Sequence, residues 1–308
     1  MNKLDPRNIY DDLHQIPELG FEEFKTSAYL ADKLEAMGYK VTRNIGGTGV
    51  IGEIKGSEPG PVMMLRADMD ALPFLIDGEK KNIHACGHDA HSAMLLAAAS
   101  ELVGKVKRGT LRILFQQGEE TLKGALAVID AGVIEDVDIA LGLHIRPVQD
   151  IAYGEMSPAV RHASSTFVNV VINGLSSHGA RPHLGVNAIE AAAVAINAIT
   201  AIKINPIIPW SCKVTGIKGG GVAPNIIPDK VEMIVDARAQ TNEAMTELLE
   251  KLRRAVTNAA AALGATAEVT TPGGVIPAAE YDDELTAEVT ECIVEVVGEE
   301  KLAKELVN

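Results

Sequence analysis

Three histidines and a cysteine lie within the eight residues from His84 to His91, although the whole chain has only 8 histidines and 3 cysteines. In an extended segment the side chains of Cys86 and His88 point the same way, because successive side chains alternate. A thiolate and a neutral imidazole side by side are ligands for a transition metal such as zinc, and Gly87 permits a tight turn between them. The cluster therefore predicts a metal site. The alternative is a set of hydrogen-bonded loop histidines beside a buried thiol.

Further candidate side chains follow the ends of predicted strands: Asp68, Asp70, Glu119, Glu120 and His144. Open α/β sheets bind ligands at the carboxyl ends of their parallel strands, so these side chains are expected at one edge. Glu120 and His144 complete a plausible ligand set with the cysteine and histidine above. A metal lowers the pKa of bound water, and a carboxylate can carry its proton to a leaving amine, which is the chemistry of amide hydrolysis. The alternative is a solvated turn at the glutamates.

The first half of the chain alternates predicted strands and helices. Strands are predicted at 39–42, 50–54, 61–66, 111–116 and 137–144, and helices after Asp5 and at 24–37, 90–106 and 124–131. Each helix is indicated by apolar residues at helical spacing, and Gly-rich turns separate the short strands. The alternation predicts an α/β fold with a mostly parallel sheet and helices on both faces.

The order of elements changes after about residue 160. A strand at 166–173 is followed by a helix at 185–203, strands at 212–216 and 230–237, a helix at 243–263 and a strand at 265–271. This order, β-α-β-β-α-β, is ferredoxin-like. The chain then resumes as a helix from Asp282. We therefore predict a catalytic α/β domain formed by residues 1–162 and 275–308, with an inserted α+β domain at 163–274.

Composition limits the class of protein. The 308 residues carry 28 basic and 42 acidic side chains, a net charge of −14, which argues against a nucleic-acid surface. The N-terminus is polar and opens a helix, so no signal peptide is expected. The longest apolar stretch, 188–204, contains charged residues, so no membrane span is expected. The cysteines Cys86, Cys212 and Cys292 suggest no disulfide framework and fit a cytoplasmic protein.

Residues 14–23, 66–73 and 84–89 resemble signatures of the zinc-dependent aminoacylase and carboxypeptidase family, in its amidohydrolase branch. That branch includes hippurate hydrolases, indole-acetyl-amino-acid hydrolases and N-acetyl-diaminopimelate deacetylases. The resemblance runs along essentially the whole chain in order. It implies a metal-dependent enzyme that hydrolyses the amide bond of N-acyl amino acids with a metal-activated water, Glu119 being the general base.

The resemblance also implies two divalent metal ions, with zinc or manganese expected and cobalt or nickel able to substitute. Four residues are implied to hold them: Cys86, which bridges the ions, and His88, His144 and Glu120. The resemblance implies that Asp70 does not bind the metal but orients one of the residues that do, a role that tunes metal affinity. Asp68 stands where other branches have a metal-binding histidine, so its role stays open.

In the inserted domain, residues 175–183 and 219–228 resemble the family's lid motifs. The resemblance implies a homodimer formed through this lid, in which His178 reaches the partner's active site and stabilises the oxyanion. It implies that Asn225 makes a polar contact and that Arg238 grips the substrate carboxylate through its planar two-donor fork. The alternative for His178 and Arg238 is that they are surface residues.

Two features depart from the family pattern. Relatives continue with a segment that carries a Gly-Gly-Glu-Asp loop and a histidine as fifth metal ligand, and we expect this sequence to lack that segment. The segment 74–83 is also shorter than the loop in relatives. Two other functions stay open: a metal-free dimeric binding protein, and a dipeptidase or carboxypeptidase of the same family. The presence of Glu119 favours an enzyme, and the Cys-Gly-His motif at 86–88 favours N-acyl amino acids as substrates.

Overall fold

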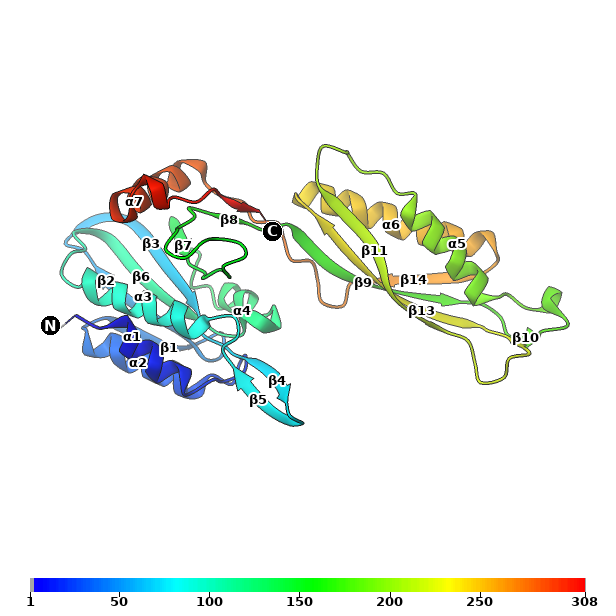
Figure 1. The fold of residues 1–308 in the computed structure, drawn as a ribbon, viewed down its shortest axis with the longest axis horizontal. Coiled ribbons are helices and arrows are strands. Elements are labelled where there is room, and N and C mark those ends of the chain that lie inside the picture. The colour runs from blue at the N-terminus through cyan, green and yellow to red at the C-terminus, as the bar shows by residue number, and fades with distance from the viewer. Residues whose placement is uncertain (1–2, 308) are drawn as a thin grey trace. The chain divides into compact units, whose positions relative to one another are not determined.

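The computed structural model describes residues 3–307. The chain divides into two compact units, Met1–Pro147 and Val148–Asn308 (Figure 1). Within residues 3–307, no helix combines the length and the apolar character needed to span a membrane.

The first unit is built on a five-stranded sheet with the order β1-β2-β6-β3-β7. Its strands are β1 (Lys40–Ile45), β2 (Gly49–Lys55), β3 (Glu58–Asp68), β6 (Arg108–Gln116) and β7 (Ile139–Gly142). Strand β2 is antiparallel to both of its neighbours, whereas β6, β3 and β7 are mutually parallel. Four strands of this sheet therefore run in one direction, which confirms the predicted mostly parallel sheet.

Helices cover both faces of this sheet, as predicted. Helices α1 (Pro6–His14), α2 (Phe24–Ala36) and α3 (His88–Leu102) lie on one face, and α4 (Gly124–Asp130) lies on the other. The alternation of side chains along β6 shows this division. Ile113 and Phe115 are buried in the cluster that holds Leu30 and Leu96, whereas Leu114 packs with Val128 of α4.

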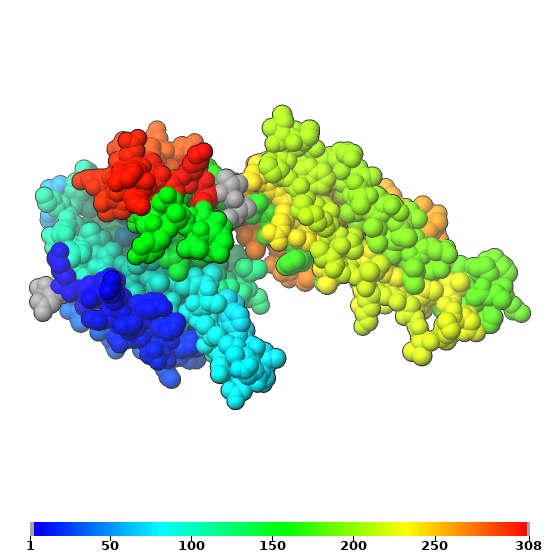
Figure 2. Space-filling view, viewed as in Figure 1, coloured from blue at the N-terminus to red at the C-terminus, as the bar shows by residue number. Residues whose placement is uncertain are grey.

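The segment 74–83 was expected to be a short loop, but it forms most of a β-hairpin. Strands β4 (Leu72–Ile76) and β5 (Glu79–Ile83) pair antiparallel across a two-residue turn. Asp77 and Gly78 have φ angles of 52° and 82°, and such Asp-Gly turns match the twist of a hairpin. The Asp-Gly pair was the signal that could have predicted it. In Figure 2 the hairpin projects from the body of the first unit.

The second unit contains the predicted ferredoxin-like fold. Its elements are β9 (Ser164–Asn173), α5 (Ala188–Thr200), β11 (Trp210–Gly219), β13 (Lys230–Ala239), α6 (Asn242–Ala262) and β14 (Thr266–Thr270). The sheet has the order β11-β13-β9-β14 and every pairing is antiparallel. Thr241 and Asn187 cap α6 and α5 with their side chains, which explains where these helices begin.

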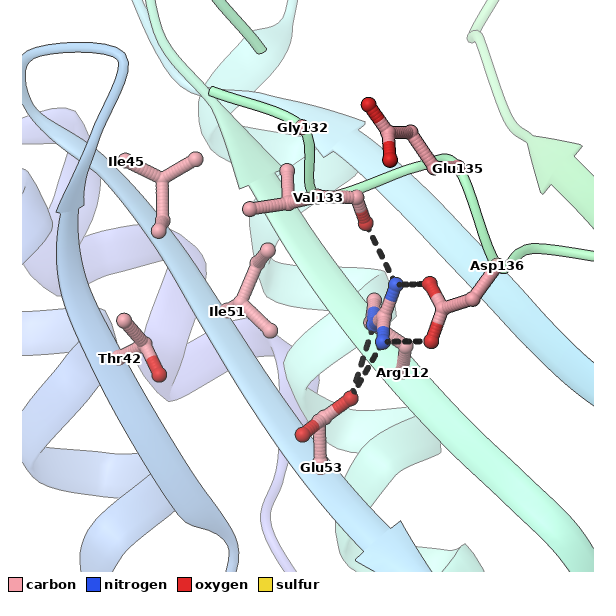
Figure 3. A pocket seen from close by; sticks show the side chains of 9 residues that line it. All are labelled: Thr42, Ile45, Ile51, Glu53, Arg112, Gly132, Val133, Glu135 and Asp136. Carbon is pink, nitrogen blue, oxygen red and sulfur yellow. Dashed lines mark hydrogen bonds and ion pairs between the residues drawn. The ribbon is translucent and has the colours of Figure 1, made fainter. Parts of the chain in front are cut away.

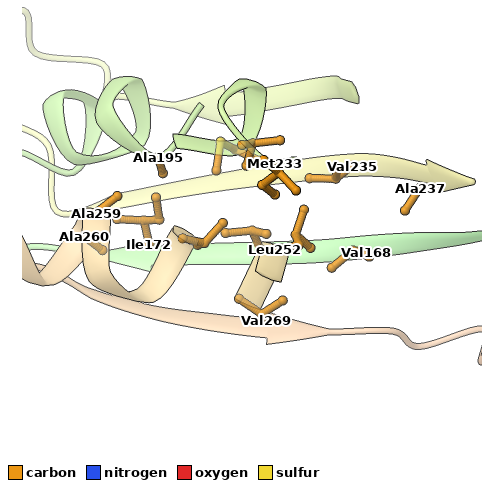
Figure 4. Packing of buried hydrophobic residues seen from close by; sticks show 14 of the residues in the cluster. Val168, Ile172, Ala195, Met233, Val235, Ala237, Leu252, Ala259, Ala260 and Val269 are labelled. Atoms are coloured by element: carbon orange, nitrogen blue, oxygen red, sulfur yellow. The ribbon is translucent and has the colours of Figure 1, made fainter. Parts of the chain in front are cut away.

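The core of this fold lies between the sheet and its two helices (Figure 4). Val168 and Ile172 of β9 and Val235 of β13 are fully buried. They pack with Leu252 of α6 and with Ala195 of α5. The alanines of α5 let its backbone approach the sheet closely, which suits a chain so poor in aromatic residues.

Shorter elements complete the second unit. Strands β10 (Ser177–His178) and β12 (Ile226–Ile227) pair antiparallel, and β8 (Val160–Arg161) pairs parallel with β15 (Leu306–Val307). Helix α7 (Asp283–Val297) begins where predicted, because Asp282 accepts a hydrogen bond from the Leu285 backbone N–H. The remaining elements are single-turn 3₁₀ helices: η1 (Glu119–Thr121), η2 (Pro182–Leu184) and η3 (Glu299–Lys301).

Candidate metal centre

The candidate residues of the first unit converge at the carboxyl ends of its parallel strands. Asp68 is the last residue of β3, Glu119 begins η1 just after β6, and His144 follows β7. His88 is the first residue of α3 and is fully buried. The neighbouring parallel strands bring these positions to one edge of the sheet, as the sequence predicted.

The backbone around the Cys-Gly-His motif differs from the extended segment that the sequence suggested. Residues 85–86 form a turn, Gly87 has a φ of 85°, and α3 begins at His88. Cys86 and His88 therefore meet through a left-handed glycine at a helix start and not through strand alternation. The positive φ favours glycine there, and a Cβ on Gly87 would also force the Ile145 side chain to move, because it would lie 2.2 Å from Ile145 Cδ1.

His88 Nε2 and Glu120 Oε1 are among the buried atoms at this edge that have no hydrogen-bond partner within the described residues. They lie 3.8 Å apart. Zinc binds nitrogen and carboxylate oxygen at about 2.0–2.2 Å, so one ion between the two atoms spans this separation. The ligand atoms of Cys86, His88 and Glu120 all lie within 4.8 Å of one another. These residues fit a metal ion in chemistry and in spacing.

Asp70 holds two of these residues in place. One carboxylate oxygen lies 3.2 Å from His88 Nδ1, and the other accepts the backbone N–H of Glu120 at 2.9 Å. The bond to Nδ1 leaves His88 Nε2 free to bind a metal. A residue that supports a metal-binding histidine typically makes this contact, a carboxylate on the ring nitrogen that does not bind the metal.

His144 is also a neighbour of the cysteine. Its Nε2 is 3.5 Å from Cys86 Sγ, and its Nδ1 donates to the Ile145 carbonyl at 2.5 Å. A second group of potential ligands consists of Asp68, His88, His91 and His144. His91 has no nitrogen left for a metal, because Nδ1 lies 2.6 Å from Asp68 Oδ1 and Nε2 accepts the Ile145 N–H at 2.9 Å.

Asp68, whose role the sequence left open, is an acceptor for basic side chains. Besides His91, it accepts a hydrogen bond from Arg66 at 3.1 Å. Burial raises the pKa of Asp68, but the hydrogen bond from His91 and the charge of Arg66 outweigh burial and lower the pKa to about 2. Asp68 is therefore an anion at neutral pH.

The Glu119 carboxylate lies beside His88 and has a raised pKa. One of its oxygens lies 3.9 Å from His88 Nε2. Burial raises the pKa of Glu119, and the charge of Glu120 adds to the rise while His88 opposes it. Burial also lowers the pKa of the His144 imidazole. A carboxylate with a raised pKa beside a cluster of potential ligands is suited to accept and return a proton.

The sequence profile described as peptidase family M20/M25/M40 matches residues 64–307. The chain belongs to this family. Its membership confirms the family resemblance seen in the sequence and the expectation of a hydrolase that acts on amide bonds.

Named relatives of this M20-family chain share most of its length. Thermostable carboxypeptidase 1 of Saccharolobus solfataricus is 36% identical over 292 residues, which cover 90% of this chain and 74% of that protein. Hippurate hydrolase of Campylobacter jejuni is 36% identical over 255 residues, covering 79% and 67%. The crystal structure of a dinuclear metal-binding M20 peptidase from Bacillus subtilis has a TM-score of 0.82 and 29% identity, covering 98% of this chain and 82% of that one.

Sequence reasoning missed one buried carboxylate of the M20-family site, Glu23. One of its oxygens accepts the backbone N–H of Gly118 at 2.8 Å, and the other accepts the Thr48 hydroxyl at 2.5 Å. Glu23 is fully buried, and its hydrogen bond to Gly118 fixes the turn that leads into Glu119. Only its place in the N-terminal signature hinted at a role, because its contact lies 95 residues away in the sequence.

The candidate residues of the second unit fall into two places within that unit. His178 and Asn225 are neighbours, since Gly179 N–H donates to the Asn225 carbonyl at 2.7 Å and His178 pairs with Ile226. Arg238 lies on β13, where its Nε donates to Asp236 at 3.1 Å. The Arg238 side chain is 58% exposed, so its guanidinium is accessible.

A separate cavity of about 290 Å³ lies between β1, β2, β6 and the segment 132–136 (Figure 3). Arg112 is its buried cation, and it donates to Glu53, Asp136 and the Val133 carbonyl. These contacts occupy all the N–H groups of the guanidinium, so Arg112 offers nothing to a ligand. None of the candidate catalytic residues lines this cavity.

Proposed function

We propose that this chain is a metal-dependent amidohydrolase that cleaves the amide bond of N-acyl amino acids. The observation that carries the proposal is the pair of buried atoms without hydrogen-bond partners, His88 Nε2 and Glu120 Oε1, beside the Glu119 carboxylate. Similarity to the hippurate hydrolase supports the choice of an N-acyl amino acid.

Cys86, His88, Glu120 and His144 are the residues that would hold two divalent ions. The thiolate and imidazole ligands favour zinc, and manganese, cobalt or nickel are the alternatives. Bound at these residues, the ions would supply Lewis acidity toward water and toward the amide carbonyl. The M20 peptidase of similar structure is described as dinuclear, which supports the number of ions.

Proton transfer is assigned to Glu119. Its carboxylate accepts a proton from the attacking water and then delivers it to the leaving amine, so one residue acts first as base and then as acid. Asp70 keeps His88 and Glu120 in place through its two hydrogen bonds. Glu23 keeps the turn before Glu119 in place through Gly118.

The second unit is proposed to supply the substrate contacts. Arg238 would bind the substrate carboxylate, and His178 and Asn225 would bind the carbonyl end of the scissile bond. We further propose that residues 163–274 form a lid through which two copies associate, and that 1–162 with 275–308 form the catalytic domain. A cytoplasmic location and the absence of a nucleic-acid or membrane partner complete the proposal.

A carboxypeptidase is the second candidate, because the Saccharolobus solfataricus relative carries that name. The two activities share the bond type and differ in the group on the acyl side of the bond that is cleaved. An acyl-amino-acid hydrolase accepts a simple acetyl or benzoyl group, whereas a carboxypeptidase requires a peptide.

A single comparison of substrates tests the proposal. The purified protein, stripped with a chelator and then reloaded with zinc or manganese, is assayed for bound metal and for hydrolysis of N-acetyl amino acids, N-benzoyl amino acids and blocked dipeptides. Metal binding with metal-dependent cleavage of the simple N-acyl amino acids is expected. Cleavage of peptides alone would replace the proposal by a carboxypeptidase. Binding of no metal and no turnover would favour a metal-free binding protein.

A further inference from the structure

His91 is a fully buried histidine that the proposed chemistry does not use. It lies on α3 three residues after His88, on the same side of the helix. Both of its ring nitrogens are engaged, with Nδ1 2.6 Å from Asp68 Oδ1 and Nε2 2.9 Å from the Ile145 backbone nitrogen. It therefore joins the end of β3 to the segment that carries His144.

The partners of His91 define its tautomer. A backbone N–H can only donate, so Nε2 accepts from Ile145 and carries no proton. The proton is then on Nδ1 and is donated to Asp68. Asp68 is itself held, because Arg66 donates to its other oxygen at 3.1 Å and the Ser92 hydroxyl donates to its backbone carbonyl at 2.8 Å. One side of His91 is thus anchored to a rigid element.

On its other side, His91 acts on His144 through a single residue. The N–H of Ile145 donates to His91, and the carbonyl of Ile145 accepts from His144 Nδ1 at 2.5 Å. That second bond places the proton of His144 on Nδ1 and leaves the Nε2 lone pair directed toward Cys86 Sγ, 3.5 Å away. The two imidazole rings lie close together, with centroids 4.4 Å apart.

We infer that His91 is a positioning residue, which fixes the orientation and tautomer of His144 through the backbone of Ile145. Side chains behind metal ligands commonly do this by a direct hydrogen bond to the ligand, as Asp70 does for His88. His91 acts one step further back, on the backbone N–H of Ile145, the residue whose carbonyl receives the bond from His144. The assignment of His144 as a metal ligand comes from the proposed function, but the link from His91 to His144 does not depend on it.

Two substitutions separate the contacts of His91. In His91→Asn the side-chain amide can occupy the place of Nδ1 and still donate to Asp68, but it cannot reach Ile145. In His91→Gln the longer amide can occupy the place of Nε2 and accept from Ile145, but it loses Asp68. Ala98→Asn, at an exposed position of the same helix, is the control for the lower helix propensity of asparagine.

The first measurement uses metal-free protein and reads the His144 tautomer from long-range ¹H–¹⁵N spectra of the imidazole nitrogens. At about pH 8 a histidine of ordinary pKa is neutral, so the two tautomers can be distinguished. We expect the Nδ1–H tautomer in the parent, in His91→Gln and in Ala98→Asn, and a mixture in His91→Asn. Unchanged spectra in His91→Asn would overturn the inference, whether or not the protein binds metal.

The second measurement titrates the same four proteins with Co²⁺ and follows the charge-transfer absorption of a cysteine thiolate bound to cobalt. Residues that support a metal ligand typically contribute about 10-fold to 100-fold in affinity, and we expect His91→Asn to lose affinity in that range. His91→Gln is expected to retain most of the affinity. Equal affinity in all four proteins would overturn the inference. A parent protein that binds no cobalt would instead contradict the proposed metal centre, and the tautomer spectra would still decide the role of His91.

Discussion

His88 Nε2 and Glu120 Oε1 lie 3.8 Å apart in a buried setting, and neither has a hydrogen-bond partner within the described chain. An unsatisfied buried polar group costs about 1–3 kcal/mol, so two such groups side by side do not favour folding. A divalent cation would satisfy both at once, while Asp70 accepts hydrogen bonds from the Nδ1–H of His88 and the backbone N–H of Glu120. The arrangement is therefore suited to bind a cation and does not by itself stabilise the fold.

Replacement of Glu119 by glutamine tests the proton shuttle. The amide has nearly the same size but cannot accept a proton, so we expect kcat to fall by about 10²-fold to 10⁴-fold while metal content and thermal stability stay unchanged. Glu250→Gln, at an exposed position of α6, is the control and should leave all three quantities unchanged. Steady-state kinetics on N-acetyl and N-benzoyl amino acids, with metal analysis, make the comparison. Turnover of Glu119→Gln at the parent rate would show that the mechanism is wrong.

Replacement of Asp70 by asparagine should weaken metal binding. Asp70 accepts two donors, His88 Nδ1–H and the Glu120 N–H, whereas the amide nitrogen of asparagine would face one of them as a second donor. We expect metal affinity to fall by about 10-fold to 100-fold, measured by competition with a chromophoric chelator. The exposed Asp130→Asn controls for the charge change. Equal affinities in the two variants would refute the supporting role of Asp70.

Replacement of Gly87 by alanine should be more disruptive than the same change at Gly78. Both glycines have positive φ angles, of 85° and 82°, so both variants incur the left-handed strain of about 1–2 kcal/mol. Only at Gly87 does the new Cβ meet another side chain, Ile145, because nothing lies within 4 Å of it at Gly78. Urea unfolding of metal-free protein should show a larger loss of unfolding free energy for Gly87→Ala. Equal losses would mean that the Ile145 contact is easily relieved.

Arg112 is predicted to stabilise the first unit without affecting chemistry. Its guanidinium joins Glu53 on β2 to Asp136, and lysine cannot reproduce the two-donor geometry. Because Asp136 is largely exposed, we expect Arg112→Lys to lose only about 1–3 kcal/mol of unfolding free energy. Arg108→Lys, at an exposed position, should lose almost nothing. A change in metal content or kcat in Arg112→Lys would contradict the structural role.

Cys212 is predicted to be an inert thiol. Burial, with a smaller contribution from the charge of Asp236, raises its pKa to about 11. Because the thiolate is the reactive form, iodoacetamide at about pH 8 should modify Cys212 at least about tenfold more slowly than the exposed Cys292. Because the pKa of Cys212 is higher in the folded protein than its ordinary value of 9.0, the contribution of this thiol to the free energy of unfolding depends on pH. The contribution is complete below pH 9.0 and is lost as the pH rises toward about 11. Mass spectrometry of the two peptides measures the rates, and similar rates would show that Cys212 is accessible.

Elements with their own local signals were predicted well. Asp5 accepts from the Arg7 N–H and Pro6 occupies the first turn of α1, as the sequence indicated. The β-α-β-β-α-β order of the second unit followed from apolar periodicity in each segment. The hairpin at 72–83 was missed, although Asp77-Gly78 marked its turn, because its two short strands are mostly exposed and show no alternation of buried and exposed residues.

The residues of the candidate site also divide into those with a local sequence signal and those without one. Cys86, His88, Glu119, Glu120 and His144 were found from residue types at strand ends and in one dense cluster. The roles of Glu23 and His91 were not found, because each depends on partners that are distant in the sequence: Gly118 for Glu23, and Asp68 and Ile145 for His91. Nothing in a local pattern reports such a contact.

The sequence by itself determined the elements, the family resemblance and the residue types able to bind a metal, because hydrophobic periodicity and ligand chemistry are local properties. The tertiary structure alone decided which atoms are left without hydrogen-bond partners, which carboxylate supports which ligand, and which tautomer each histidine adopts. Those features depend on distances of a few ångströms between strand ends. Such distances are set by the parallel pairing of β6, β3 and β7 and by the packing of α3 against them.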